Sequence, residues 1–390
     1  MLKKIFLVVV IVFMAGIISS CCCNTNDMSF QFYKNLGLTY FDDKDYNKAL
    51  KYLEKAEKIK QDDWEVYNYI AEIYNNNGNY DSAIDNYEKA IKLKPFDSLL
   101  YNDLGNTLFS MAKYDEAIKN YEKAVEIYPE EKVYHYNIGL SYNRLGQYDK
   151  SIQKFKKAIS INPEYLDAKI DLADSYLKDN QYENAHETYK KVLYREPKNF
   201  DALLGIVDTY YYQNKYNDAL GALDKMDDHY DSSFDVFYAY GDVYKARGNL
   251  EKSKDDYKKA VNYYKKAIDI EPDNLTVLNA LAHMYYLLDE YDKSKDCLDK
   301  MISIDPEYYD AYLGYGCIEK SLKNYDKALD YFNKAIKIEP NSYRAHTHLG
   351  DVYQLKKDYK NAKKHYKKVL EISPDNDEIK KELKKIEKEV

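Results

Sequence analysis

The stretch that decides the fold is residues 98–131, SLLYNDLGNTLFSMAKYDEAIKNYEKAVEIYPEE, which carries a proline near its end. Prolines recur along the chain at a fixed interval, at Pro95, Pro129, Pro163, Pro197, Pro272, Pro306, Pro340 and Pro374. The interval is 34 residues within each group of four, and 75 residues, or 34 plus 41, between the groups. A constant period of this length predicts a stack of structural repeats rather than separate globular domains.

Ten copies of the period begin at residues 30, 64, 98, 132, 166, 200, 234, 275, 309 and 343. Position 8 is small in nine copies, position 20 is Ala or Ser in all ten, and position 17 is Tyr in nine. Apolar residues at positions 4, 7, 8 and 11 form one helical stripe, and positions 20, 24 and 27 form a second. We therefore expect each copy to be a helical hairpin. Its turn should hold a left-handed residue such as Gly78, Gly146, Gly248, Asn180 or Asn214.

A hairpin with two apolar faces must bury one of them against its neighbour, so the copies should stack. The run Leu104-Gly105, with Ala117, Tyr121, Ala124 and Pro129, resembles the tetratricopeptide repeat. The resemblance covers residues 30 to about 376 and implies an all-α, right-handed superhelical solenoid. Its concave groove would be formed by the first helix of each hairpin. Residues 30–374 would form the ten repeats, and residues 375–390 a capping helix. The stripe of that helix is Ile379, Leu383, Ile386 and Val390.

Repeat seven is seven residues longer than the others. It contains the near-duplicate runs Tyr257–Val261 and Tyr264–Ile268. Because seven residues make nearly two helical turns, the simplest expectation is a second helix longer by about 10 Å. A neutral duplication and a protruding, partner-binding helix both fit this pattern.

The first twenty residues differ from the repeats. Lys3 and Lys4 precede an uncharged core from Ile5 to Ile18, which is typical of a signal peptide in residues 1–20. The run Ile18-Ser19-Ser20-Cys21 resembles the bacterial lipoprotein processing box. The resemblance implies cleavage before Cys21, lipidation of its thiol, and a lipid-anchored tether over residues 21–29. Residues 22–29 of this tether would span at most about 28 Å. The alternatives are a single transmembrane anchor and plain secretion. The lipoprotein and the transmembrane anchor would both place the repeats outside the cytoplasmic membrane but fixed to it, in the cell envelope.

Composition and motifs give no sign of catalysis. The net charge is −8, with charged residues of both signs, which does not favour nucleic acid as a partner. No phosphate-binding loop, nucleophile elbow or metalloprotease motif is present, so we expect no enzyme activity, cofactor, metal or small-molecule substrate. Cys297 and Cys317 are either two packing thiols or, since they lie in adjacent hairpins, a disulfide.

The remaining candidate is the groove of repeats five to seven. Each of these repeats carries Asp at positions 2 and 9, interleaved with aromatic residues. We predict a peptide-binding surface formed by Asp167, Asp174, Asp201, Asp208, Asp235, Asp242, Tyr211, Tyr212 and Tyr238. The position-2 residues lie in first helical turns, where a carboxylate also suits the helix dipole. The position-9 residues lie mid-helix, where Asp is a poor helix former and a binding role is easier to argue.

We expect a membrane-tethered, non-enzymatic scaffold that binds a protein or a Lys/Arg-bearing peptide in this groove. Two alternatives stay open. One is an assembly factor for envelope complexes, such as outer-membrane proteins or pili. The other is a non-catalytic subunit of an enzyme complex.

Overall fold

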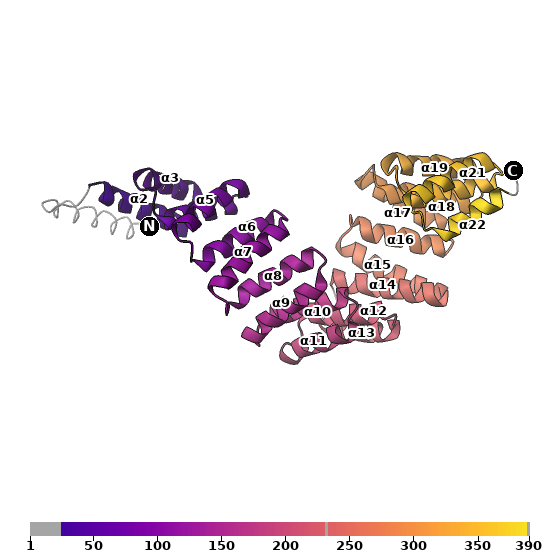
Figure 1. Cartoon of the computed structure of the whole chain (residues 1–390). Helices are drawn as coiled ribbons and strands as arrows, with labels where there is room; N and C mark the ends of the chain where they lie inside the picture. Colours follow the sequence, from indigo (N-terminus) through magenta and orange to yellow (C-terminus); the bar gives the residue numbers. More distant parts are fainter. Residues whose placement is uncertain (1–24, 231–232, 388–390) are drawn as a thin grey trace. The chain divides into compact units, whose positions relative to one another are not determined.

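The computed structural model describes residues 25–230 and 233–387, and that part of the chain is built from helices without strands. The chain forms two compact units, Met1–Pro197 and Lys198–Val390 (Figure 1). Within each unit the helices follow one another as antiparallel pairs in sequence order. The predicted signal peptide and Cys21 lie outside the described residues.

The first helices of the ten pairs are α2 Thr25–Asp42, α4 Trp64–Asn76, α6 Ser98–Ser110, α8 Lys132–Arg144, α10 Leu166–Lys178, α12 Phe200–Tyr212, α14 Phe234–Glu251, α16 Leu275–Leu287, α18 Tyr309–Ser321 and α20 Tyr343–Leu355. The second helices are α3 Tyr46–Ile59, α5 Tyr80–Leu93, α7 Tyr114–Ile127, α9 Tyr148–Ile161, α11 Tyr182–Arg195, α13 Tyr216–Tyr230, α15 Lys254–Ile270, α17 Tyr291–Ile304, α19 Tyr325–Ile338 and α21 Tyr359–Ile372. The all-α solenoid expected from the period is confirmed.

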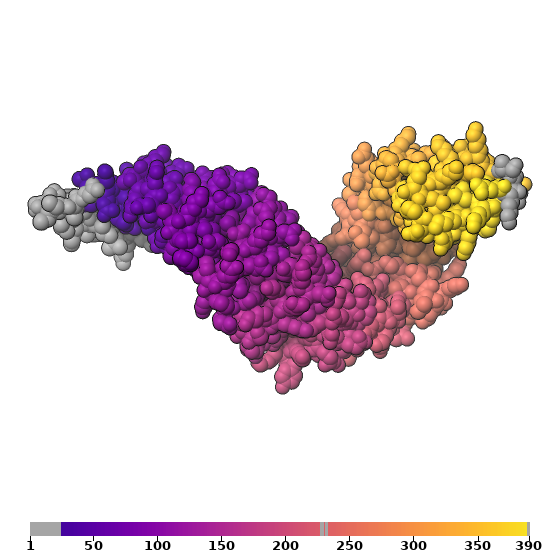
Figure 2. Space-filling view, viewed as in Figure 1, coloured from indigo at the N-terminus to yellow at the C-terminus, as the bar shows by residue number. Residues whose placement is uncertain are grey.

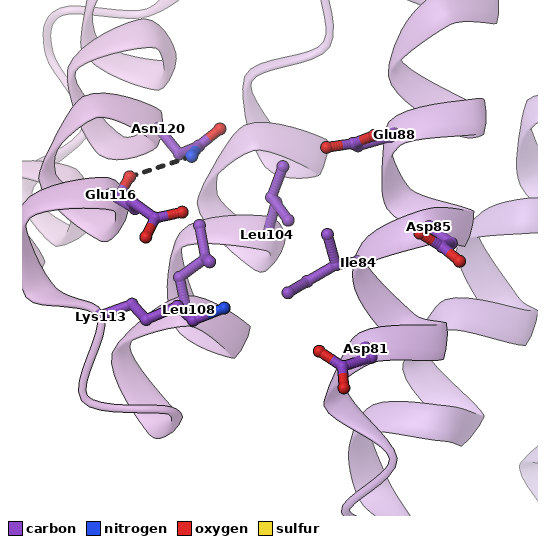
Figure 3. Close-up of a pocket in the computed structure, with 9 residues that line it drawn as sticks. All are labelled: Asp81, Ile84, Asp85, Glu88, Leu104, Leu108, Lys113, Glu116 and Asn120. Atoms are coloured by element: carbon purple, nitrogen blue, oxygen red, sulfur yellow. Dashed lines mark hydrogen bonds between the residues drawn. The ribbon is translucent and has the colours of Figure 1, made fainter.

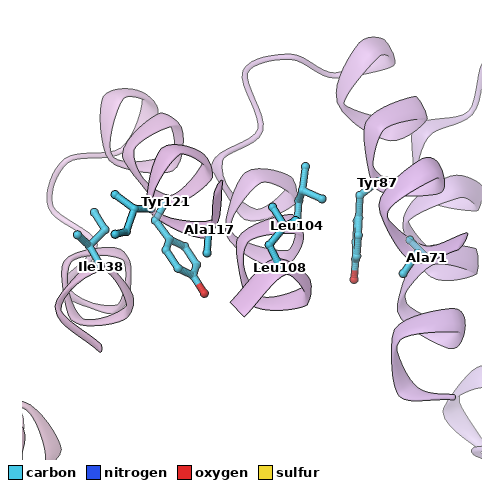
Figure 4. Packing of buried hydrophobic residues seen from close by; sticks show 9 residues of the cluster. Ala71, Tyr87, Leu104, Leu108, Ala117, Tyr121 and Ile138 are labelled. Carbon is cyan, nitrogen blue, oxygen red and sulfur yellow. The ribbon is translucent and has the colours of Figure 1, made fainter. Parts of the chain in front are cut away.

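The two helices of a pair approach closely because one small residue faces one large ring. A Cβ atom added to Gly105 would lie 2.5 Å from the ring of Tyr121, and one added to Gly350 would lie 2.4 Å from the ring of Tyr366. Ala117, at position 20, is fully buried beside the same contact (Figure 4). Each ring therefore fills the space that a side chain at position 8 would take, which is how small residues at positions 8 and 20 permit close packing.

The stack itself is held by apolar contacts between neighbouring pairs. In repeats two to four, Ala71 and Tyr87 of one pair, Leu104 and Leu108 of the next, and Ile138 of the third belong to one buried cluster (Figure 4). In the space-filling view, side chains close the gaps that the ribbons leave between successive helices of each unit (Figure 2). The core is therefore continuous from pair to pair within a unit, as expected for a repeat that cannot fold alone.

The turn inside each pair uses one residue in the left-handed region. Gly78, Gly146, Asn180 and Asn214 adopt φ values of 74°, 70°, 59° and 58°, as the sequence predicted. The prediction for Gly248 is wrong. Gly248 is buried inside α14, and Lys252 takes the left-handed conformation instead, with φ of 54°.

The extra seven residues of repeat seven lie at the tip of the hairpin and are shared by both helices. α14 has 18 residues where most first helices have 13, and α15 has 17 where most second helices have 14. The expectation that only the second helix is longer is therefore wrong. The packing residues of α15 are Ala260 and Tyr264, with the ring of Tyr264 beneath Gly241, so the insertion precedes them.

The ends of the described chain also differ from the middle. Helix α2 begins at Thr25, so residues 25–29 of the predicted tether are helical and advance about 8 Å rather than about 17 Å. Helix α22, Asp377–Ile386, buries Ile379 and Ile386 against Tyr366 and Val369 and so confirms the capping helix. Among the helices of the described residues, none has the length and apolar character needed to cross a bilayer.

Candidate functional site

First helices of consecutive pairs touch one another, as α6 does with α8, α8 with α10, α16 with α18, and α18 with α20. These helices carry the aspartates at positions 2 and 9 and the tyrosines of the predicted groove. Asp167 and Asp174 belong to the first unit, and the other predicted groove residues belong to the second, so each group is described within its own unit.

The three position-2 aspartates are exposed. Asp167, Asp201 and Asp235 each lie in the first turn of their helices, α10, α12 and α14. A carboxylate there interacts favourably with the unsatisfied N–H groups and the positive end of the helix dipole. Their geometry therefore agrees with the helix-starting role, and their exposure leaves them open to a partner.

Two of the three position-9 aspartates, Asp174 and Asp242, have a structural role that the sequence analysis did not foresee. Asp174 accepts a hydrogen bond from the hydroxyl of Tyr189, and Asp242 accepts one from the hydroxyl of Tyr264 at 2.6 Å. Asp242 also forms a 2.5 Å ion pair with Lys245. These mid-helix carboxylates satisfy the polar end of a buried ring on the second helix, and that role accounts for a residue type that disfavours helix interiors.

The same pairing recurs in other repeats. The hydroxyl of Tyr121 donates to Asn106 at 2.9 Å, and that of Tyr366 donates to Asp351 at 3.0 Å. Allowing for the insertion in repeat seven, five copies have Tyr at position 24, and all five carry Glu, Asn or Asp at position 9. The sequence therefore contained this signal. Repeat six departs from this pattern, because it carries Asp208 at position 9 but Leu223 at position 24.

The predicted aromatic residues form part of the packing in the second unit. Tyr212 is exposed, and its ring meets that of Tyr211 edge-on at 5.4 Å. Tyr238 stacks on Phe234 with ring centroids 6.0 Å apart. Burial, reinforced by Asp242, raises the pKa of Tyr238 to about 12. Of these three tyrosines, Tyr212 offers the most exposed surface to a ligand.

A different acidic site lies between the second helices of repeats two and three (Figure 3). It is a hollow of about 290 Å³ lined by Asp81, Ile84, Asp85, Glu88, Leu104, Leu108, Lys113, Glu116 and Asn120. Leu104 and Leu108 of α6 form a buried apolar floor between α5 and α7. The charged side chains around it are exposed.

The hollow has four carboxylates and one ammonium group, so its formal charge is −3. An apolar floor beneath carboxylates suits a long basic side chain, whose methylene stem is apolar and whose head is cationic. Asn120 donates to the main-chain oxygen of Glu116 at 3.0 Å, and this bond holds the amide on one wall (Figure 3). The arrangement can bind a cationic side chain but has no nucleophile or proton relay.

Sequence reasoning missed this hollow, although its spacing was readable. Asp81, Asp85 and Glu88 are four and three residues apart, which places them on one face of α5. Within the described part of the chain, no group of three or more His, Cys, Asp or Glu side chains could hold a metal ion. Cys297 and Cys317 are both free thiols, so the disulfide alternative does not hold.

Family models described as tetratricopeptide repeat match residues 30–63, 65–130, 95–164, 142–204, 176–236, 234–262 and 252–314. The model of the regulator of microtubule dynamics protein 1-3 matches residues 316–390. No curated protein sequence matches the chain.

Three solved structures are similar to parts of this chain. A tetratricopeptide repeat protein from Parabacteroides merdae is 16% identical, with a TM-score of 0.52, over 66% of this chain and 99% of its own. MamA from Desulfovibrio magneticus is 23% identical, with a TM-score of 0.42, over 44% and 97%. PilF from Pseudomonas aeruginosa is 20% identical, with a TM-score of 0.44, over 55% and 97%.

The family models cover residues 30–314 almost without a gap, and the repeats of the structure continue the pattern to residue 372. Stacked hairpins of this kind are generally non-catalytic scaffolds for protein–protein interaction. The chain belongs to the tetratricopeptide repeat family.

Proposed function

We propose that this protein is a membrane-tethered scaffold that holds a Lys/Arg-bearing segment of a partner protein. The observation that carries the proposal is the acidic hollow between α5 and α7, with its apolar floor at Leu104 and Leu108. The exposed first-turn carboxylates Asp167, Asp201 and Asp235 offer further acidic positions on the first helices of their own units. Attraction of this kind raises the association rate and the specificity for basic segments.

The binding test uses the full chain and a short fluorescent peptide rich in Arg and Leu. A peptide with Glu in place of Arg serves as the charge control. Asp85→Lys combined with Glu88→Lys reverses the charge of two carboxylates on the α5 wall of the hollow. We expect this double variant to weaken binding of the basic peptide by about tenfold or more and to flatten its salt dependence.

The matched control is Asp115→Lys combined with Glu122→Lys. These two exposed carboxylates lie on α7 and do not line the hollow. Together with burial, they raise the pKa of Tyr142 in the following repeat. The control changes the net charge by the same amount, so a general charge effect would weaken binding equally in both double variants. Equal weakening, or equal binding of the Glu peptide, would refute the hollow as the binding site.

The tether rests on the resemblance of Ile18-Ser19-Ser20-Cys21 to a lipoprotein processing box. We expect the mature chain to begin at Cys21, to carry lipid there, and to fractionate with membranes. Cys21→Ser should abolish lipid labelling. Intact-mass measurement of the membrane fraction decides the matter. A chain that keeps residues 1–20 would favour the transmembrane anchor, and an unmodified soluble chain would favour secretion.

A further inference from the structure

Two cysteines of the second unit lie in different chemical surroundings. Cys317 of α18 faces His348 of α20, with 3.6 Å between Sγ and Nε2. Lys320, one helical turn after Cys317, places Nζ 3.2 Å from Nδ1 of His348 and 3.1 Å from Asp351. The imidazole ring is packed on the ring of Phe332, with centroids 5.1 Å apart. Four polar side chains from two adjacent first helices therefore converge at one place.

The hydrogen on the histidine can be assigned from its neighbours. An ammonium group only donates hydrogen bonds, so in the neutral ring Nδ1 accepts from Lys320 and the proton sits on Nε2. In the protonated ring, both nitrogens carry protons. In either state, the nitrogen that faces Cys317 bears a hydrogen and donates it to the sulfur.

The N–H group of His348 therefore points at the sulfur of Cys317, and the ammonium group of Lys320 lies beside the same imidazole ring. Hydrogen-bond donors and cations next to a partly exposed cysteine are typical of reactive thiols. The opposing charge of Asp351 is partly neutralised by its ion pair with Lys320, and its carboxylate also accepts a hydrogen bond from Tyr366 at 3.0 Å. Burial works against the charged form of His348, yet Asp351 and Cys317 together raise the pKa of this ring. The cluster thus supplies both hydrogen-bond donation and positive charge next to a sulfur atom.

Cys297 on α17 provides the contrast within the same unit. It packs in the apolar cluster with Leu281 and Tyr285. Burial, followed by the nearby Asp296, raises the pKa of its thiol to about 11. Both cysteines are partly exposed, so accessibility alone does not separate them. The difference lies in their polar neighbours.

We propose that Cys317 is a site of reversible thiol–disulfide exchange with low-molecular-weight disulfides. The Cys317 thiolate attacks one sulfur of the disulfide, a new sulfur–sulfur bond forms, and the original bond breaks. The leaving thiolate departs with the electron pair and takes a proton from Nε2 of His348 or from water. The sulfur of Cys317 is oxidised and the leaving sulfur is reduced, so no further oxidant is required.

The test uses the full chain with oxidised glutathione as the probe. Mass spectrometry of the separate peptides follows modification of Cys317, Cys297 and the amino-terminal cysteines independently. We expect Cys317 to react about tenfold faster than Cys297, or more, and the two rates to converge in denaturant.

Two variants address the mechanism. His348→Phe keeps an aromatic ring on Phe332 but removes the N–H donor, and Lys320→Met removes the ammonium while keeping the length of the side chain. Each should slow modification of Cys317 by about threefold or more without changing Cys297. The control is Lys360→Met, an exposed lysine of α21. Thermal melts identify any variant that has lost its fold.

Equal rates for the two cysteines in the folded wild type would overturn the proposal. So would folded His348→Phe and Lys320→Met proteins in which Cys317 reacts as fast as in the wild type. Because the rate contrast in the wild type needs no substitution, a variant that fails to fold still leaves the proposal open to refutation.

Discussion

The hydroxyl of Tyr264 and the carboxylate of Asp242 are 2.6 Å apart and join the two helices of repeat seven. The ring of Tyr264 is fully buried beneath Gly241, and its hydroxyl lies beside Asp242 on the first helix. A carboxylate in the middle of α14 is therefore part of the packing. Four repeats show this contact with Asp or Asn as the acceptor, so the polar residue at position 9 is coupled to the ring at position 24.

Tyr264→Phe removes the hydroxyl and leaves Asp242 with Lys245 and Tyr238 as polar partners. We expect the free energy of unfolding to fall by about 2 kcal/mol, because a hydrogen bond to a charged group is lost. Urea denaturation followed by circular dichroism measures this change. Tyr212→Phe, at an exposed ring of the same unit, should change stability by less than about 0.5 kcal/mol. Similar losses in both variants would argue against the contact.

The close approach of the helices predicts opposite effects for two glycine substitutions. In Gly350→Ala, the new methyl group would lie 2.4 Å from the ring of Tyr366, and we expect a loss of about 1–3 kcal/mol from overpacking. Gly221 is exposed inside α13, and a Cβ atom added there would meet no other atom within 4 Å, so Gly221→Ala should stabilise by about 0.5–1 kcal/mol. Thermal unfolding compares the two. A neutral Gly350→Ala would contradict the packing argument.

The insertion in repeat seven is held by an ion pair at its base. Arg247 donates to both oxygens of the buried Asp256, at 2.8 and 2.7 Å, and also to Asn217 of the preceding repeat at 2.6 Å. These hydrogen bonds lower the pKa of Asp256. Arg247→Met should cost about 3–5 kcal/mol, because it leaves a buried carboxylate without its cation.

Adding Asp256→Leu to Arg247→Met removes the uncompensated charge as well. We expect the double variant to recover most of the lost stability, since replacing both partners of a buried pair is far less costly than removing one. Urea denaturation of the two single variants and the double variant gives the coupling free energy. Additive losses would show that the pair does not hold the extended tip.

Stability should also depend on pH through His365 of α21. Burial, followed by His346 and Lys364, lowers the pKa of His365 from its ordinary value of 6.5 to about 4. As the pH falls below about 6.5, the unfolded chain takes up a proton on this imidazole while the folded chain does not. The free energy of unfolding therefore decreases until about pH 4, where the folded chain is protonated as well, and is then constant. The loss should be on the order of 2–3 kcal/mol.

His365→Phe keeps an aromatic ring beside Tyr353, on which His365 stacks at 5.6 Å. Since Phe cannot be protonated, the variant should lose less stability than the wild type between pH 6.5 and 4. Urea midpoints measured across this range test the prediction. Parallel curves for the two proteins would show that another group is responsible.

Much of the fold could be predicted from the spacing of residues, because the same helical hairpin with the same pattern of small and apolar positions occurs ten times. The turn residues Gly78 and Asn180 were predictable, since each sits where a left-handed conformation closes the hairpin. Gly248 was misassigned because a seven-residue insertion preserves the helical face. Local sequence could not show where the shifted register resumes. That was decided by the contact of Tyr264 with Gly241.

The candidate sites were harder to predict. Asp174 and Asp242 looked like binding residues because their buried tyrosine partners lie 15 and 22 residues further along the chain. The acidic hollow joins α5, α6 and α7, and the sulfur–imidazole contact of Cys317 and His348 spans 31 residues. Each depends on which faces the stacked helices turn toward one another.

The sequence by itself determined the repeating unit: two helices, one left-handed turn, and small residues where the helices meet. It did so because apolar periodicity and backbone sterics act over a few residues and are repeated in every copy. The tertiary structure alone decided which polar groups became partners. Burial makes an unsatisfied hydroxyl or charge costly, and its partner is chosen by packing between helices that the chain brings together from a distance.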